Sequence, residues 1–483
     1  RRPASARLTW NLARSIRDPA KHLELAVPVS FDVLHAIVKA YDIRGLVATQ
    51  LDEELAEAIG AAAAVVLGEG EGAIAVGYDM RPSSEPLVAA FARGANAQGV
   101  DVVNIGLAST DMLYYASGSL GLPGAMFTAS HNPAAYNGIK LCRAGAAPVS
   151  LETGLAEIRD LVLAGGPGPV SGPAGTVHHR ALLADFADHV RSFVDVTRLS
   201  PVSLVVDAGN GMAGYVLPAV FEPLPMQVEE MYFELDGTFP NHPADPIDPA
   251  NIVDLCAAVV AGGHALGLAF DGDADRMFAV DEKGVPVSSS VIGAVVADRL
   301  LRRTPGATVL HNLICSDVVA ETITAAGGIP IRTRVGHSLI KQRMAETDAI
   351  YACEHSGHHY FRDNYRADSG LIAALVLLEA VAESGAPLSE VVAPYDRYAA
   401  SGERNHRVSD VAAATAAVAH AFGDRETASD TEDGLTLRLE GGWFNLRPSN
   451  TEPLLRLNVE GVDVDRMLAI RDEVEDIITG AGA

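Results

Sequence analysis

The sequence contains few cysteines and no long apolar run. Its four cysteines form no CxxC pair, so neither a disulfide framework nor a cysteine-rich zinc site is expected for Cys142, Cys256, Cys315 and Cys353. We expect reduced, buried thiols in a cytoplasmic protein. No apolar stretch reaches the roughly 20 residues that span a bilayer, so no membrane partner is expected. Residues 1–30 lack the apolar segment of a secretory signal, and we interpret them as a loosely attached N-terminal extension.

Basic residues are scarce as well. Lys and Arg number 36 against 62 Asp and Glu, which gives a formal net charge of −26. A field of this sign repels phosphate backbones, which argues against nucleic-acid binding through a general basic face. A small anionic substrate would need basic side chains gathered at one place. Apolar residues make up 48% of the 483 residues, which is typical of a folded chain with three or four domains.

Three segments of the chain follow one pattern. Each has an apolar strand that ends in a polar residue, then a helical stretch, and then a second strand before a Gly-containing loop. The first strands of these segments are residues 73–79, 203–207 and 308–312. A strand, a crossover helix and a parallel strand form a βαβ unit, so three related α/β domains are expected.

The last part of the chain follows a different pattern. Residues 435–439 and 454–459 alternate apolar and polar side chains, as half-buried strands do, and helical stretches lie on either side. We therefore expect three related α/β domains of mixed sheet and a C-terminal α+β domain with an antiparallel sheet. After the extension at 1–30, the predicted domains are 31–175, 176–284, 285–400 and 401–483.

The segment Asp271-Gly-Asp-Ala-Asp-Arg276 carries a clear chemical signal. Three carboxylates within five residues repel one another unless a cation neutralises them, and the small residues between them let the loop curl around a hard ion such as Mg²⁺. An EF-hand is the main alternative, because Glu282 falls at calcium-loop spacing. However, Arg276 stands where that loop needs glycine. The apolar strands on both sides also favour a metal loop over a solvated acidic turn.

The segment Thr128-Ala-Ser-His-Asn-Pro133 follows an apolar strand, at the position where ligands bind in open α/β sheets. Ser130 beside His131 is a candidate nucleophile, and Lys140 is placed to neutralise a phosphate nearby. Ser, Asn and Pro are also ordinary turn residues, so this segment taken alone favours a plain turn. It is not a Gly-x-Ser-x-Gly elbow, which argues against an esterase triad.

Further polar segments suit a sugar phosphate. Glu354-His-Ser-Gly-His358 alternates a carboxylate, a hydroxyl and an imidazole, which suits vicinal sugar hydroxyls, although a polar strand end is an equally good interpretation. Arg447-Pro-Ser-Asn-Thr-Glu-Pro453 offers a two-pronged phosphate contact, against the alternative of a solvated turn. Tyr41-Asp-Ile-Arg-Gly45 and Val335-Gly-His-Ser338 each place a basic side chain beside a glycine.

Together and in this order, these segments resemble the α-D-phosphohexomutase family, and within it the bacterial phosphomannomutases. The resemblance extends from about residue 40 to the C-terminus. It implies four domains around a central cleft. It also implies that the protein interconverts mannose 6-phosphate and mannose 1-phosphate through a phosphoserine and a hexose 1,6-bisphosphate. Mg²⁺ would be the cofactor, and the bisphosphate the activator.

The resemblance also assigns roles to residues. It implies that Ser130 carries the phosphate and binds Mg²⁺ together with Asp271, Asp273 and Asp275. The implied catalytic residues are Ser130, His131, Lys140, Arg276 and His337. The implied substrate-binding residues are Tyr41, Arg44, Gly336, Glu354, Ser356, His358, Arg447, Ser449, Asn450 and Thr451.

Two positions depart from the family pattern. Cys353 stands where the sugar loop usually has glycine, and Ile314 stands where many relatives carry a lysine in the cleft. A missing lysine would remove one positive charge from the cleft and change its selectivity for phosphates.

The alternatives differ in the acceptor and in the sugar. A phosphatase would use the same Ser130 and metal with water as the acceptor. A non-catalytic sugar-phosphate-binding protein would not need Ser130, the three aspartates and Lys140 together. Asn450 favours a hexose phosphate over glucosamine phosphate, because glucosamine-phosphate relatives usually have glycine there. Mannose is favoured over glucose, or over a dual specificity, on overall similarity alone. The sequence does not indicate an oligomeric state.

Overall fold

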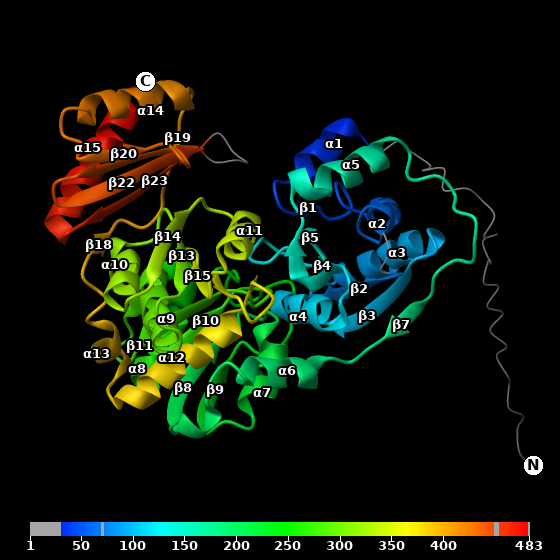
Figure 1. The fold of residues 1–483 in the computed structure, drawn as a ribbon, viewed down its shortest axis with the longest axis horizontal. Coiled ribbons are helices and arrows are strands. Elements are labelled where there is room, and N and C mark those ends of the chain that lie inside the picture. The colour runs from blue at the N-terminus through cyan, green and yellow to red at the C-terminus, as the bar shows by residue number, and fades with distance from the viewer. Residues whose placement is uncertain (1–29, 69–71, 449–453, 482–483) are drawn as a thin grey trace, which may run out of the picture.

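Four sheets follow one another along the described part of the chain (Figure 1). The computed structural model describes residues 30–68, 72–448 and 454–481, so the predicted extension lies almost wholly outside it. The three repeated segments each form the predicted parallel strand–helix–strand unit, and the fourth sheet is antiparallel. The predicted fold class is therefore confirmed.

The first sheet is mixed. Its strands are β1 (Ile43–Leu46), β2 (Ala73–Tyr78), β3 (Asp101–Leu107), β4 (Gly124–Phe127), β5 (Tyr136–Arg143), β6 (Ala147–Pro148) and β7 (Val177–His179). They lie in the order β1-β5-β4-β2-β3-β7, with β6 beside β5, and β5 runs antiparallel to β1, β4 and β6. The helices are α1 (Phe31–Ile37), α2 (Glu53–Leu67), α3 (Ser84–Ala97), α4 (Thr110–Leu120) and α5 (Leu155–Leu163).

The second sheet has the order β12-β11-β10-β8-β9, with β11 antiparallel to β10. Its strands are β8 (Val202–Asp207), β9 (Met226–Met231), β10 (Leu266–Phe270), β11 (Met277–Asp281) and β12 (Pro286–Val287). The helices of this domain are α6 (Leu183–Arg191), α7 (Ala213–Phe221) and α8 (Val253–Gly262).

The third sheet has the order β14-β13-β15-β16-β17. Its strands are β13 (Thr308–Asn312), β14 (Ile329–Thr333), β15 (Tyr351–Cys353), β16 (His359–Phe361) and β17 (Ala367–Asp368). The helices are α9 (Ser289–Arg303), α10 (Asp317–Ala325), α11 (His337–Thr347), α12 (Gly370–Ser384) and α13 (Leu388–Val392).

The fourth sheet has the order β18-β23-β22-β21-β20, and β19 also pairs with β23. Its strands are β18 (Ala399–Ala400), β19 (Arg404–Arg407), β20 (Ala428–Asp430), β21 (Leu435–Leu439), β22 (Gly442–Pro448) and β23 (Leu454–Gly461). Two helices cover it, α14 (Val411–Phe422) and α15 (Val464–Ala481). Asp410 caps the first of these helices by accepting a hydrogen bond from the amide of Ala413.

One apolar core runs through parts of the first three domains, the first domain has a second core of its own, and the fourth domain has a separate core. Residues 371–378 of α12 are all fully buried, and this helix packs against α6 of the second domain and α9 of its own. The core of the fourth domain is formed by α14, α15 and the long strands of its sheet. Polar contacts join it to the third domain: Arg438 donates two hydrogen bonds of 2.8 Å to Asp317.

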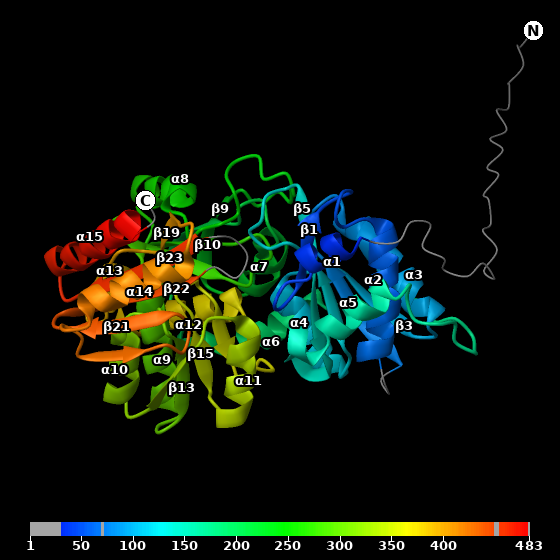
Figure 2. The same ribbon diagram turned by 90° about the horizontal axis from the view of Figure 1, so that it is seen from above.

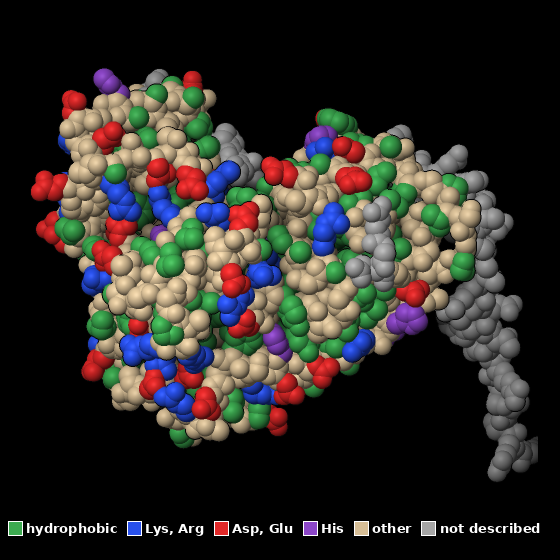
Figure 3. Space-filling model, viewed as in Figure 1, with side chains coloured by type: hydrophobic (Ala, Val, Ile, Leu, Met, Phe, Trp, Pro, Cys, Tyr) green, Lys and Arg blue, Asp and Glu red, His purple; other side chains and the backbone are tan. Residues whose placement is uncertain are grey.

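This separation is visible in the ribbon views. The fourth domain (orange to red) lies against the third, and the first domain (blue to cyan) lies on the other side of the molecule (Figures 1 and 2). The space-filling view shows the surface hollowed between the fourth domain and the first (Figure 3). Among the described residues, no helix is both long and apolar enough to cross a membrane.

Short strands lie at all three predicted domain boundaries. β7 pairs with β3 in the first sheet, β12 pairs with β11 in the second, and β18 pairs with β23 in the fourth. The point at which the chain leaves one sheet for the next therefore lies a few residues away from 175, 284 and 400. The division of the chain at those residues stays a prediction.

All four cysteines are free thiols. Cys142, Cys315 and Cys353 are buried as expected, but Cys256 is only partly buried. The expectation was wrong for Cys256 because it lies on α8, whose neighbouring positions Val253 and Val260 are 60% and 57% exposed.

Candidate active site

The predicted magnesium loop connects the antiparallel strands β10 and β11, which are buried along their whole length. The side chains of Asp271, Asp273 and Asp275 are buried, and one oxygen of each lies within 4.8 Å of the others. Ala274 completes the tight curl with a left-handed backbone at φ 60°. Burial excludes a solvated turn, and the flanking strands exclude an EF-hand.

Two basic side chains neutralise part of this charge. Lys140 donates hydrogen bonds of 2.7 Å to Asp273 and Asp275, and Arg276 lies 2.9 Å from Asp271. Burial opposes ionisation, but the Lys140 ammonium holds the pKa of Asp273 below its usual range. Oδ1 of Asp273 and Oδ1 of Asp275 are buried and accept no hydrogen bond from the described residues. Orphaned carboxylate oxygens of this kind fit a hard cation such as Mg²⁺.

Ser130 lies directly against this loop although it belongs to the first domain. Its hydroxyl donates a hydrogen bond of 2.7 Å to Oδ2 of Asp271 and lies 3.3 Å from Nδ1 of His131. Its backbone is left-handed, with φ 50°. Gly272 permits the close approach, because a Cβ there would lie 2.5 Å from the Ser130 carbonyl oxygen. The structure thus brings the predicted nucleophile and the predicted metal loop together.

The loop around Ser130 is surrounded by basic groups. Arg44 donates a hydrogen bond of 3.2 Å to the carbonyl oxygen of Ala129. Burial lowers the pKa of His131 well below its usual value, and the charges of Arg276 and Arg44 lower it further. The lowered pKa favours the uncharged form of the His131 imidazole, which can accept a hydrogen bond.

The predicted sugar-binding segment turns between β15 and β16 of the third domain. Its Glu354 is buried and accepts hydrogen bonds from the Asn312 amide group at 3.1 Å and from the Tyr360 hydroxyl at 2.7 Å. The Ser356 hydroxyl lies 3.0 Å from Nδ1 of His358. A carboxylate held by buried partners is preorganised for a ligand, which argues against a plain polar strand end.

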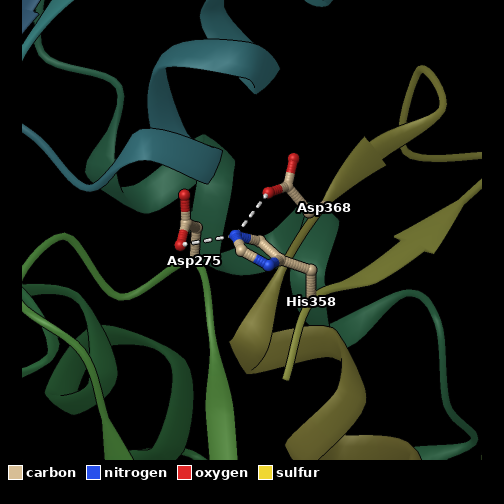
Figure 4. A group of neighbouring side chains, drawn as sticks. All are labelled: Asp275, His358 and Asp368. Carbon is tan, nitrogen blue, oxygen red and sulfur yellow. Dashed lines mark ion pairs between the residues drawn. The ribbon is translucent and has the colours of Figure 1, made fainter. Parts of the chain in front are cut away.

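His358 joins this segment to the magnesium loop. Its Nε2 lies 3.5 Å from Asp275 and 3.8 Å from Asp368, between the two carboxylates (Figure 4). The backbones of Arg276 and His358 also form an antiparallel bridge. Burial lowers the pKa of His358, while the charge of Asp275 opposes the change. An imidazole in this position can exchange a proton with a bound hydroxyl.

Tyr41, Gly336 and His337 lie together between the first and third domains. The ring centroids of Tyr41 and His337 are 5.2 Å apart. The Gly336 amide donates a 3.4 Å hydrogen bond to Glu354, and a Cβ at Gly336 would lie 2.5 Å from the Tyr41 hydroxyl oxygen. Burial raises the pKa of Tyr41; among the charges near it, Glu354 raises this pKa and Arg447 lowers it. The structure therefore places these residues beside the sugar-binding segment.

Arg447 lies near the end of β22 and is largely buried, and it donates a hydrogen bond of 3.0 Å to Glu403. Its Nε is buried and has no partner among the described residues. β22 and β23 run antiparallel, and in Figure 1 the end of β22 and the start of β23 lie on the side of the fourth domain that faces the first. The predicted phosphate-binding residues Ser449, Asn450 and Thr451 lie outside the described residues.

Sequence reasoning missed several polar residues of this centre. Thr110, at the start of α4, donates its hydroxyl to Asp273, and Lys341 of α11 lies 3.4 Å from Asp368. Arg81 binds the Ser130 carbonyl oxygen at 2.8 Å. A signal was available for two of them, because Thr110 follows β3 and Arg81 follows β2 just as Ser130 follows β4.

The two departures from the family pattern are both buried. A Cβ at Gly293 of α9 would lie 2.8 Å from the sulfur of Cys353, so this thiol fills space beside that glycine. Ile314 is 7% exposed and brings no charge. The effect of Ile314 on phosphate selectivity stays a prediction.

The matches to known families cover all four domains. Alpha/beta/alpha domains I, II and III of phosphoglucomutase/phosphomannomutase match residues 35–166, 184–284 and 288–398, and the C-terminal domain matches residues 403–477. The chain belongs to the phosphoglucomutase/phosphomannomutase family. The predicted family and the predicted enzyme class, a phosphohexomutase, are thereby confirmed.

Individual relatives agree with this assignment. The phosphomannomutase of Salmonella montevideo is 41% identical over 451 residues, which cover 91% of this chain and 98% of that protein. A phosphoglucomutase/phosphomannomutase family protein from Burkholderia thailandensis has a similar structure, with a TM-score of 0.83, 30% identity, and coverage of 92% of this chain and 97% of that one. N-acetylphosphoglucosamine mutase from Aspergillus fumigatus, solved with GlcNAc-6P and magnesium, shares the fold at a TM-score of 0.58 and 14% identity, over 95% of this chain and 100% of that one.

Proposed function

We propose that this phosphohexomutase interconverts mannose 6-phosphate and mannose 1-phosphate through phosphorylated Ser130 and a hexose 1,6-bisphosphate. The observation that carries the proposal is the 2.7 Å hydrogen bond between the Ser130 hydroxyl and Asp271, at the edge of a buried carboxylate cluster. The relative named phosphomannomutase, 41% identical over 91% of this chain, supports mannose as the sugar. A cytoplasmic location and the absence of a nucleic-acid partner stay predictions from the sequence.

The residues around Ser130 suit phosphoryl transfer, which depends on positioning and charge neutralisation. Asp271, Asp273 and Asp275, together with an oxygen of the phosphoserine, would hold Mg²⁺. When bound, Mg²⁺ would offset the negative charge of the phosphoryl group. Lys140 and Arg276 are fixed beside these carboxylates by contacts of 2.7 and 2.9 Å, and they add positive charge from the protein itself.

Each half-reaction exchanges one bond for another. In the first, the bond from phosphorus to Oγ of Ser130 breaks while a bond to the free sugar hydroxyl forms; that hydroxyl gives up its proton, and Oγ of Ser130 takes one up. The uncharged imidazoles of His131 and His358 are the candidate acceptors. In the second half-reaction the bisphosphate has turned around, and the bond from its other phosphorus to the sugar breaks while a bond to Oγ of Ser130 forms. The Ser130 hydroxyl gives up its proton, and the oxygen left on the sugar takes one up.

The same site must hold the sugar in both orientations. Glu354 and Ser356 would contact ring hydroxyls, while Arg447 would hold the phosphate that does not react. Tyr41, Arg44, Gly336 and His337 would line the remainder of the cleft. Because the fourth domain has a core separate from the other three, it can close over the bound sugar and keep water from hydrolysing the phosphoserine.

Peptide mass analysis tests the covalent step. We expect one phosphoryl group on the peptide that contains Ser130, and no activity in the Ser130→Ala variant. Ser119→Ala, at an exposed serine of the same domain, is the matched control and should keep wild-type activity. An active Ser130→Ala variant, with the phosphate on another residue, would refute the proposed mechanism.

A turnover assay tests the substrate and the acceptor. Mannose 1-phosphate and glucose 1-phosphate are compared as substrates with catalytic glucose 1,6-bisphosphate, and free phosphate is measured in parallel. We expect the higher kcat/KM for mannose 1-phosphate. A clear preference for glucose 1-phosphate would make the enzyme a phosphoglucomutase. Release of one phosphate per turnover without dependence on the bisphosphate would make it a phosphatase.

A further inference from the structure

The guanidinium group of Arg81 is saturated by hydrogen bonds, four of them to backbone carbonyls around Ser130. Nη2 donates to the carbonyl oxygens of Ser130 and Asn132 at 2.8 and 2.7 Å. Nη1 donates to those of Pro133 and Tyr136, both at 2.9 Å. Nε forms an ion pair of 3.1 Å with Asp79. All five N–H donors of the side chain are therefore used.

This arrangement suits arginine alone. A lysine has three donors on one nitrogen and cannot reach four carbonyls in a planar fork. Arg81 and Asp79 are both buried, and a buried ion pair of this kind is weak evidence for a role in stability. The carbonyls that it gathers belong to the one loop whose serine we assign as the phosphate carrier. The arrangement therefore favours a role in shaping that loop.

The second domain covers Arg81 from the other side. The ring of Phe239 lies 5.0 Å from the guanidinium carbon. Gly237 packs so closely that a Cβ there would lie 2.5 Å from the Cα of Arg81. The segment with Gly237 and Phe239 belongs to the domain that carries the magnesium loop. Arg81 thus lies between the loop of Ser130 and the neighbouring domain, where it fixes one relative to the other.

The bond to the Ser130 carbonyl also orients the next amide. In a trans peptide the C=O and the N–H point in opposite directions. Because the Ser130 carbonyl points at Arg81, the amide N–H of His131 points away from it. That N–H has no hydrogen-bond partner in the part of the chain that the structure describes. The positive charge of Arg81 beside the Ser130 carbonyl also polarises the peptide between Ser130 and His131, and this strengthens the His131 N–H as a hydrogen-bond donor.

We propose that Arg81 is a positioning residue for the phosphoryl transfer. It holds the loop of Ser130 in its left-handed conformation and turns the His131 amide toward the phosphoryl group on Ser130. Arg81 itself does not touch the substrate. This inference rests on the proposed role of Ser130 as the phosphate carrier.

The test compares Arg81→Lys with Arg143→Lys. Arg143 is a matched control because it also donates to backbone carbonyls of the first domain, those of Val66 and Thr153, but away from Ser130. For Arg81→Lys we expect kcat to fall about 100-fold, since a displacement near 1 Å costs about that much. The KM for mannose 1-phosphate should stay within about threefold of wild type, because the proposed sugar and phosphate contacts are unchanged. Arg143→Lys should keep the wild-type kcat even if its melting temperature falls.

A second readout follows the covalent step directly. The dephosphorylated enzyme is mixed with glucose 1,6-bisphosphate, and phosphate on Ser130 is followed by mass spectrometry. Arg81→Lys should acquire it about 100-fold more slowly than wild type. Wild-type speed in this variant would overturn the inference, whereas a wild-type enzyme that never phosphorylates Ser130 would overturn the proposed function instead.

A milder variant keeps the test decisive if Arg81→Lys does not fold. Phe239→Leu removes only the ring over the guanidinium group, so the loop should be loosened rather than lost. We expect kcat and the rate of Ser130 phosphorylation to fall together, by about 3- to 10-fold, with KM unchanged. A fall in melting temperature with both rates unchanged would mean that Arg81 is structural only, and the inference would be withdrawn.

Discussion

Replacing Gly272 by alanine tests how closely the magnesium loop must approach Ser130. The added Cβ would lie 2.5 Å from the Ser130 carbonyl oxygen, which is 0.9 Å short of the 3.4 Å at which ordinary contact begins. Neither side can yield easily. Arg81 holds that oxygen at 2.8 Å, and the Met212 amide holds the Gly272 carbonyl at 2.9 Å. The two loops must therefore separate by most of that distance.

The expected effect on catalysis follows from this separation. A displacement of about 1 Å costs on the order of 100-fold in rate, so kcat of Gly272→Ala should fall by roughly that factor. Overpacking should also lower the stability by about 1–3 kcal/mol. Steady-state kinetics and thermal melting measure the two effects. Gly168→Ala is the control, because nothing lies within 4 Å of a Cβ there. A Gly272→Ala enzyme with wild-type kcat would refute the reasoning.

Three further changes test other parts of the site. Asp273→Asn removes one of the three carboxylates, so the Mg²⁺ concentration for half-maximal activity should rise at least about tenfold; full activity in excess chelator would count against a metal role. Arg447→Ala should weaken the binding of mannose 6-phosphate by about 2–5 kcal/mol, and so raise its KM more than it lowers kcat. The control Arg456→Ala removes another partner of Glu403 and should leave this KM unchanged. Burial raises the pKa of Asp111 to about 7, above the ordinary 3.8. Between pH 3.8 and about pH 7 the folded protein therefore keeps a proton on Asp111 that the unfolded chain loses. As the pH rises through this range, the free energy of unfolding should fall by up to about 4 kcal/mol because of this group. Asp111→Asn should remove that loss in urea unfolding at pH 4 and pH 8, and equal pH slopes for the two proteins would contradict the assignment.

The fold could be predicted where the chain has long, regular patterns. The three strand–helix–strand units could be predicted because buried parallel strands such as β8 and β13 are short apolar runs followed by a helical stretch. The short edge strands were not. β7, β12 and β18 contain only two or three residues each, which is too few to show any alternation. Their pairing depends on neighbours that are distant in the sequence, so the sheets extend beyond the predicted boundaries.

The site could be predicted where chemistry is concentrated in one segment. Asp271 and Ser130 stand in dense polar motifs, and the structure places the two side chains in contact. Arg81 and Thr110 stand in ordinary-looking turns, and only tertiary contacts give them partners at this centre. Asp368 was missed for the same reason, since its partner His358 lies in the turn between β15 and β16.

The separate core of the fourth domain bears on how this architecture can be recombined. Exchanging β18 to α15 with the same segment of a relative leaves the apolar interior of the other three domains untouched. Such a chimera needs the polar contacts between the third and fourth domains to be kept, and the ion pair of Arg438 with Asp317 is one of these contacts. The first and second domains offer no such freedom, because the Gly272 backbone fits against Ser130 and Gly237 against Arg81. In a family of interchangeable parts, these two domains should be inherited as a pair, while the fourth can be exchanged alone.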